Sequence, residues 1–174
     1  MRCGSPDQQR RHASPKLWPE PSAIRATYNT LLDVNLTCVA VIATASLPLP
    51  RKAPNPKVVS ITSSLGSITN ALTKNMARPP SYSASKVGLN GLKAHKQVSE
   101  NDRVGQEWID GAEEKTRRIM LLVVGPRALK TTFTGFHDMG KDPKVGAEAV
   151  VRLIGNEDDK HVFDQSMCRF NRTR

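Results

Sequence analysis

Apolar residues follow two different spacings along the chain, and together these spacings predict alternating helices and strands. Over residues 22–46 they recur every three or four positions, as in an amphipathic helix, and Pro48 and Pro50 end this pattern. Two short runs, 58–62 and 119–124, consist of apolar or β-branched residues except for Ser60. Such runs are typical of strands that are covered on both faces of a sheet.

Capping signals place two more helices. Ser81 is a good N-cap for a helix running through Leu92, and Asp142 followed by Pro143 predicts the start of another that ends at Gly155. We expect the remaining stretches to be a Ser/Gly/Asn-rich loop, a charged surface extension and a weak last strand, at residues 63–80, 97–115 and 161–164 respectively.

This order of elements predicts an α/β fold. We expect a partial Rossmann-like, doubly wound parallel sheet of about three strands with flanking helices. A chain of 174 residues suits one such domain, which we place at 23–165. A basic, proline-rich lead over 1–22, expected to be disordered, and a basic tail over 166–174 flank it.

The chain is strongly basic, with a formal net charge of +10, which raises the question of nucleic-acid binding. The basic residues are spread over three segments, and aromatic residues make up only 5% of the chain, too few for a base-stacking platform. We therefore expect no nucleic-acid partner, and retain this function only as a less favoured alternative.

Cysteine and histidine positions argue against disulfides and metals. The three cysteines and four histidines are widely separated, so they match neither a disulfide framework nor metal-ligand spacing. The first 22 residues hold no signal-peptide apolar run, and no stretch approaches the roughly 20 apolar residues of a membrane span. We expect a cytoplasmic protein without a metal or a membrane partner.

Tyr82 and Lys86 are the sharpest candidates for chemistry. Four residues apart, they lie on one face of the predicted helix. A nearby ammonium lowers the pKa of a phenol from about 10, which would suit proton transfer to a substrate oxygen. The alternative is an ordinary exposed pair. Ser63 ends the preceding strand, where ligands bind in parallel α/β sheets, although by itself a loop hydroxyl would be the simpler interpretation.

The order of these motifs resembles the catalytic region of short-chain dehydrogenases/reductases. Segment 58–67 followed by 82–86 resembles the family's strand-end Ser and its Tyr-x-x-x-Lys motif. Upstream, 33–36 is similar to the helix with an internal active-site Asn. Downstream, 123–127 with Thr131 is similar to the Pro-Gly motif and the Thr beyond it. The resemblance covers roughly residues 24–155, and we interpret the chain as the C-terminal half of such a protein, truncated at its N-terminus.

The resemblance implies a role for each matching residue. Tyr82 would be the general acid/base, Ser63 would orient the substrate carbonyl, and Lys86 would hold the nicotinamide ribose. Asn35 would anchor a water in a proton relay, although without the family pattern it would be a solvent-facing mid-helix residue. Pro126 and Thr131 would contact the nicotinamide. The implied cofactor is NADP or NAD, with NADP slightly preferred, and the substrate a small carbonyl or alcohol.

The sequence departs from the family in three places. It lacks a strand, glycine-rich turn and helix to hold the pyrophosphate; Arg127 replaces the glycine of the Pro-Gly motif; and the interval from Ser63 to Tyr82 is wide. The function expected is thus an NAD(P)-dependent oxidoreductase. The alternative is a non-catalytic remnant that acts only through protein contacts. In both cases we expect the chain to self-associate. It could form a homodimer through the helices containing Asn35 and Tyr82, or it could associate along an uncovered strand edge.

Overall fold

The computed structural model describes residues 20–74, 79–111, 117–136, 138 and 140–155. Over these residues the chain is a mixed α/β protein, mostly helical, with a two-stranded parallel sheet. The third strand expected at 161–164, the tail and nearly all of the basic lead lie outside the described residues.

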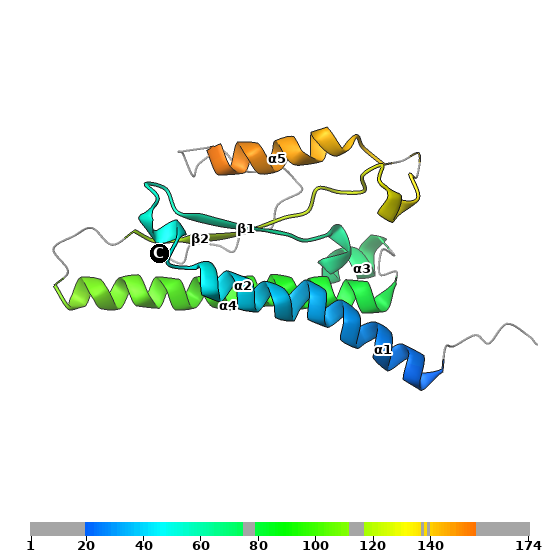
Figure 1. Ribbon diagram of the computed structural model, residues 1–174, viewed down its shortest axis with the longest axis horizontal. Helices are drawn as coiled ribbons and strands as arrows, with labels where there is room; N and C mark the ends of the chain where they lie inside the picture. Colours follow the sequence, from blue (N-terminus) through cyan, green and yellow to red (C-terminus); the bar gives the residue numbers. More distant parts are fainter. Residues whose placement is uncertain (1–19, 75–78, 112–116, 137, 139, 156–174) are drawn as a thin grey trace, which may run out of the picture.

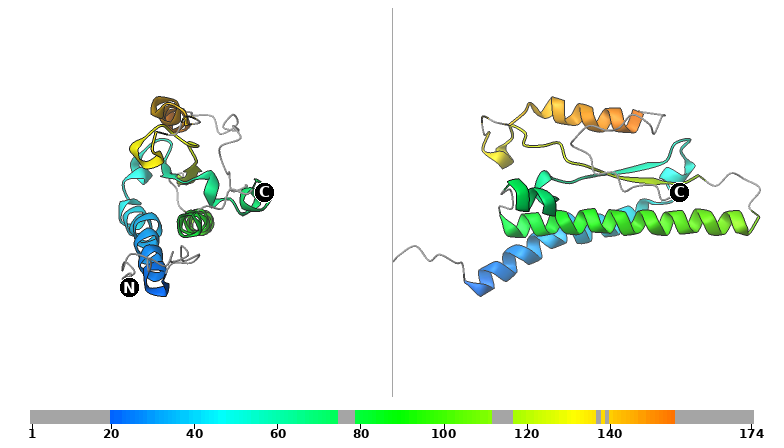
Figure 2. Two further views of the ribbon diagram at one scale, coloured as in Figure 1. Left: turned by 90° about the vertical axis from the view of Figure 1, so that its right-hand side faces the viewer. Right: turned by 180° about the vertical axis from the view of Figure 1, so that it is seen from behind.

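The sheet consists of β1 (Lys57–Ile61) and β2 (Met120–Val124), the two apolar runs of the sequence. The strands are parallel, with Lys57 level with Met120 and Ile61 level with Val124. The N–H of Thr62 donates to the Val124 carbonyl, so the pairing continues past the end of β1. Helices cover both faces (Figures 1 and 2): α5 (Pro143–Gly155) lies on one, while α4 (Pro80–Ile109) and the N-terminal helices lie on the other.

The predicted first helix is confirmed as one continuous helical segment. It consists of α1 (Pro21–Leu32), a π-helical turn η2 (Asp33–Thr37) and α2 (Cys38–Ser46). With 26 residues this segment is long and apolar enough to cross a membrane, which corrects the expectation that no part of the chain resembles a membrane span. Core helices of soluble proteins can have the same length and apolar composition. Only 6% of its most apolar window is buried, so most of its apolar surface faces outward.

The loop expected over 63–80 is partly helical, which is a second correction. Two short helices form there, η4 (Ser64–Gly66) and α3 (Ile68–Lys74). Another short helix, η3 (Pro50–Lys52), precedes β1, and η5 (Thr132–Thr134) follows β2. Asp142 caps α5 as expected, since its carboxylate accepts from the Lys144 N–H at 2.8 Å. Ser81 does not cap α4: it is a buried residue inside the helix, whose N-cap position is Pro79.

The charged segment 97–115, expected as a surface extension, is helical as far as Ile109, because α4 continues to that residue. The residues of α4 that face the sheet are largely polar, so apolar periodicity does not reveal this part of the helix. Gln97 bonds the backbone of β2 as a neighbouring strand would: its amide donates to the Ile119 carbonyl at 3.2 Å and accepts from the Leu121 N–H at 2.8 Å.

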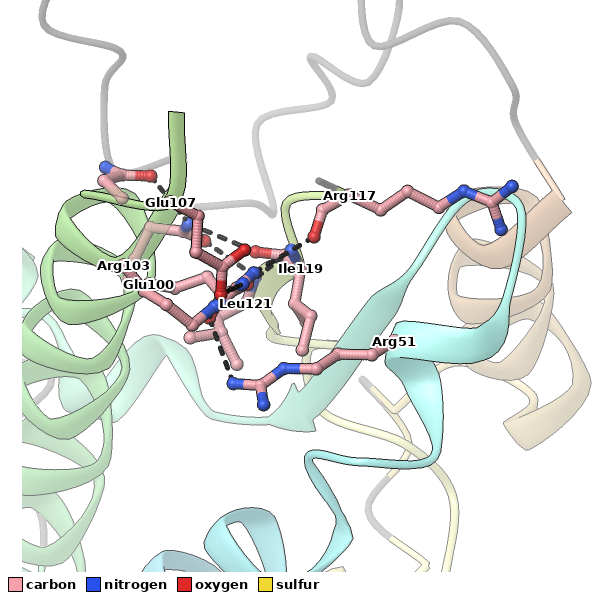
Figure 3. A network of polar contacts seen from close by, with 9 residues as sticks. Arg51, Glu100, Arg103, Glu107, Arg117, Ile119 and Leu121 are labelled. Atoms are coloured by element: carbon pink, nitrogen blue, oxygen red, sulfur yellow. Dashed lines mark hydrogen bonds and ion pairs between the residues drawn. The ribbon is translucent and has the colours of Figure 1, made fainter. Parts of the chain in front are cut away.

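Glu100 is the centre of a polar network that holds the far end of α4 to the sheet (Figure 3). Its carboxylate is only 6% exposed and accepts from the buried Ile119 N–H at 3.0 Å and from Arg103 at 2.6 and 2.9 Å. Arg51 lies 3.6 Å away and Glu107 pairs with Arg103. Burial alone would raise the pKa of Glu100, but the hydrogen bonds from Arg103 and Ile119 and the two arginine charges outweigh it and lower the pKa.

Candidate active site

The segments that follow both strands meet the start of α4 at one end of the molecule (Figure 1). Parallel neighbouring strands end at the same edge of a sheet, so residues just beyond β1 and β2 share this end. Ser63 comes two residues after β1, Pro126 two residues after β2, and Tyr82 and Lys86 occupy the first turns of α4. The fold therefore brings together the residues that the sequence singles out.

Tyr82 is partly buried, and the side chain of Ser63 lies close enough to interact with its phenol. Burial raises the pKa of the phenol above its ordinary 10.0, and the interaction with Ser63 offsets part of that increase. The expected lowering of this pKa by Lys86 is thus not found: burial has the largest effect, and the group that lowers the pKa is Ser63. A raised pKa keeps Tyr82 protonated at neutral pH, so it can donate a proton to a bound oxygen.

Lys86 lies beside the ring, with Nζ 5.7 Å from the Tyr82 ring centroid. The side chain is only 8% exposed, burial lowers its pKa, and Nζ donates to the Ile61 carbonyl at 3.0 Å. Since the next residue, Thr62, bonds toward β2, the Ile61 carbonyl points to the opposite edge of β1. Lys86 is therefore fixed against the end of β1, and an ammonium there has two further N–H donors.

Asn35 lies in the π-helical turn, a type of helix irregularity that often occurs at functional sites. It does not face solvent as a plain mid-helix residue would: it is partly buried, and Nδ2 donates to the Ser85 hydroxyl at 3.1 Å. Ser85, which is fully buried, donates in turn to the Tyr82 carbonyl at 2.8 Å. Asn35 thus connects to the backbone of Tyr82 through Ser85.

Three supporting residues, Ser85, Asn90 and Gly66, are not singled out by the sequence pattern. Asn90 accepts from the Thr62 hydroxyl at 2.7 Å and donates to the Gly66 carbonyl at 3.1 Å, so it ties the end of β1 to η4. A Cβ on Gly66 would lie 2.9 Å from the Lys86 Cβ, so only glycine allows this approach. Asn90 follows Lys86 by one helical turn, so this spacing could have indicated that Asn90 lies on the same face of α4 as the candidate site.

The segment after β2 contributes a tightly built turn. Thr131 caps η5, and its hydroxyl contacts that of Thr134 at 3.4 Å, so the side chain takes part in a local capping box. Pro126 and Leu129 pack on Gly146 of α5, where a Cβ would lie 3.3 and 2.8 Å from their side chains. Between them, Arg127 has a φ of 67°, the left-handed conformation that glycine would adopt without strain.

Comparison with known proteins identifies relatives of the chain. It is 49% identical over 147 residues, 84% of its length, to the short-chain dehydrogenase/reductase AFUA_1G00990 of Aspergillus fumigatus. It is 26% identical over 153 residues to the short-chain dehydrogenase anuI of Penicillium roqueforti. The chain spans about half the length of each, 54% and 55%. No protein-family model and no solved structure matches it.

Proposed function

Because this chain belongs to the short-chain dehydrogenase/reductase family, which implies a Rossmann-like fold, we propose that it is an NAD(P)-dependent oxidoreductase that reduces a carbonyl or oxidises an alcohol. One observation carries the proposal. The Lys86 ammonium lies 5.7 Å from the Tyr82 ring, and Ser63 interacts with the same phenol, where two parallel strands end.

In the direction of reduction, Tyr82 donates its proton to the carbonyl oxygen and becomes a phenolate. Ser63, which lies close to Tyr82, donates its single hydroxyl proton in a hydrogen bond to the same oxygen and thereby orients the substrate. The Lys86 ammonium stabilises the phenolate electrostatically. Asn35 acts as a positioning residue, because through Ser85 it holds the backbone of Tyr82 in place.

A nicotinamide cofactor, when bound, supplies the hydride that these side chains cannot. The residues present fit its reactive end. Lys86 Nζ is held at the end of β1 with donors left for the two hydroxyls of a ribose, and Tyr82 lies beside it. Pro126 and Thr131, on the turn after β2, are proposed to contact the nicotinamide. NADP is slightly preferred to NAD, and we assign no residue to the pyrophosphate.

The direct test measures cofactor binding before turnover. Nucleotide fluorescence of NADPH and of NADH is titrated with the full chain, and a panel of small carbonyl compounds is then assayed for turnover. Tyr82→Phe should retain nucleotide binding and lose at least about a hundredfold in kcat, the contribution of a general acid. Tyr28→Phe, at the chain's other tyrosine, is the matched control. Absence of NAD(P)H binding, or full activity of Tyr82→Phe, would contradict the proposal.

A second candidate is a non-catalytic protein that acts through protein contacts. Large apolar side chains on the first helical segment are exposed, among them Val34, Val41 and Ile42. The occupant we propose is a second copy, packed along this segment and α4, which already run side by side: Lys96 of α4 donates to Thr44 of α2 at 2.6 Å. Light scattering should then show a dimer that Val41→Asp dissociates; a monomer would exclude it.

A further inference from the structure

The turn after β2 carries a cation in a conformation that costs free energy. Arg127 has a φ of 67°, and for a residue with a Cβ this left-handed backbone is unfavourable relative to glycine. Such strain persists only where the surroundings impose it, and it is concentrated at functional sites. Here the surroundings do impose it, because both flanks of Arg127 are fixed.

Packing holds one face of the turn, since Pro126 and Leu129 both lie against Gly146 of α5. Backbone hydrogen bonds hold its far side: Lys141 donates to the Ala128 carbonyl at 2.9 Å, and Lys130 donates to the Lys141 carbonyl at 2.8 Å. The arginine backbone is therefore anchored on a rigid support while its side chain is exposed.

The sheet places this arginine on a segment that starts at the same edge as the candidate active site. Ile61 is level with Val124, and the Thr62 N–H still bonds to the Val124 carbonyl, so both strands end at one edge of the sheet. Ser63 follows β1 at this edge, and Arg127 follows β2 there, three residues after Val124. From this shared edge we infer that Arg127 can reach a ligand bound at Tyr82.

The charges in this turn have no protein partner among the residues that the structure describes. No ion pair or side-chain hydrogen bond joins Arg127, Lys130 or Lys141 to any of them, whereas Arg51, Arg103 and Arg152 all pair with glutamates. An arginine fork recognises a carboxylate or phosphate through two parallel hydrogen bonds. Such a group on a bound ligand would be the ion-pair partner that Arg127 lacks among the described residues.

We propose that Arg127 is a specificity-determining residue that binds an anionic group, a carboxylate or a phosphate, of the molecule that reacts at Tyr82. The inference rests on the proposed function, because it assigns the ligand class of that same site. A carboxylate would belong to the substrate, an acidic carbonyl compound, and a phosphate to the cofactor. Lys130 and Lys141, joined backbone to backbone beside Arg127, add positive potential around the bound group.

Binding can be tested without turnover, so failure of the dehydrogenase proposal would not be mistaken for failure of this one. Acetoacetate, its neutral ethyl ester and inorganic pyrophosphate are each titrated into the full chain and observed by ligand NMR. Arg127→Gln keeps a side chain in the same backbone conformation and removes the charge. We expect at least about a fivefold loss of affinity for acetoacetate, pyrophosphate or both, with no change for the ester.

The two anions identify the source of the group. If Arg127→Gln loses affinity for acetoacetate alone, the anionic group belongs to the substrate. If it loses affinity for pyrophosphate alone, the group belongs to the cofactor. Either result supports anion recognition by Arg127. Arg152→Gln is the matched control, since it removes one positive charge from the last turn of α5, at the end of that helix away from the turn after β2 (Figure 1), and should change nothing.

Arg127→Gly provides an independent readout. It should unfold at a higher urea concentration than the unmodified chain, because the backbone strain is relieved, and yet bind the anion as weakly as Arg127→Gln does. The inference is overturned if the unmodified chain binds neither anion, if Arg127→Gln binds both unchanged, or if the ester is lost in parallel.

Discussion

Removal of the Glu100 carboxylate should destabilise the fold strongly, because several groups on two elements depend on it. The carboxylate is 6% exposed and accepts three hydrogen bonds, one from the backbone of Ile119 and two from Arg103 (Figure 3). In Glu100→Ala the Ile119 N–H, which belongs to a fully buried residue, loses its acceptor, and the partly buried guanidinium of Arg103 loses two of its hydrogen bonds and keeps those to Glu107 and to the Arg117 carbonyl.

The magnitude follows from these lost acceptors. A buried N–H left without an acceptor costs about 1 to 3 kcal/mol. Removing one partner of a buried, hydrogen-bonded ion pair costs about 3 to 5 kcal/mol, a range that includes such orphaned groups. We therefore expect Glu100→Ala to lower the free energy of unfolding by about 3 to 5 kcal/mol. Glu100→Gln still offers Ile119 an oxygen but loses the charge, so about 1 to 2 kcal/mol is expected.

Urea unfolding followed by circular dichroism measures both variants at neutral pH, with Glu148→Ala on α5 as an exposed control. The pH dependence is a second check. Because the pKa of Glu100 is lowered on folding, its contribution is complete above the unfolded value of about 4.3 and is lost as pH falls through the folded pKa. The difference between the unmodified chain and Glu100→Gln should thus shrink in acid. A Glu100→Ala variant within about 0.5 kcal/mol of the unmodified chain would refute the reasoning.

Three further measurements test other parts of the structure. Lys93 is fully buried, its Nζ has no hydrogen-bond partner among the described residues, and burial lowers its pKa. Lys93→Met should therefore raise the free energy of unfolding at pH 7 by about 1 to 3 kcal/mol. A less stable variant would show that Nζ has an acceptor. Tyr82 should titrate above 10.0 by tyrosinate absorbance, and any stability gained from its burial should fade as pH rises through that value; titration below 10.0 would contradict the burial argument. Gly66→Ala should lower the free energy of unfolding, measured in urea, by about 1 to 3 kcal/mol, because its Cβ would lie 2.9 Å from the Lys86 Cβ. An unchanged urea midpoint would mean that η4 can move away from α4.

The sequence determines the elements whose apolar residues are regularly spaced. The β-branched run at 58–62 and the apolar run at 119–124 form β1 and β2, and the helix over residues 22–46 forms as one continuous segment. Prediction from pattern succeeds there because the spacing of apolar residues within each segment matches the period of its helix or strand. The matching order of Ser63, Tyr82 and Lys86 indicates the family for the same reason, since it is a property of the chain alone.

The tertiary structure decides what depends on a neighbouring element. In the second half of α4, Gln97 bonds the backbone of Leu121 in β2 and Glu100 bonds that of Ile119 just before it, so the face toward the sheet is polar and leaves no apolar period to detect. The pKa of Tyr82 is likewise raised and not lowered, because burial by surrounding elements outweighs the opposing effect of Ser63. Hydrogen bonds and desolvation join residues that are distant in sequence, and only the folded chain determines which of them meet.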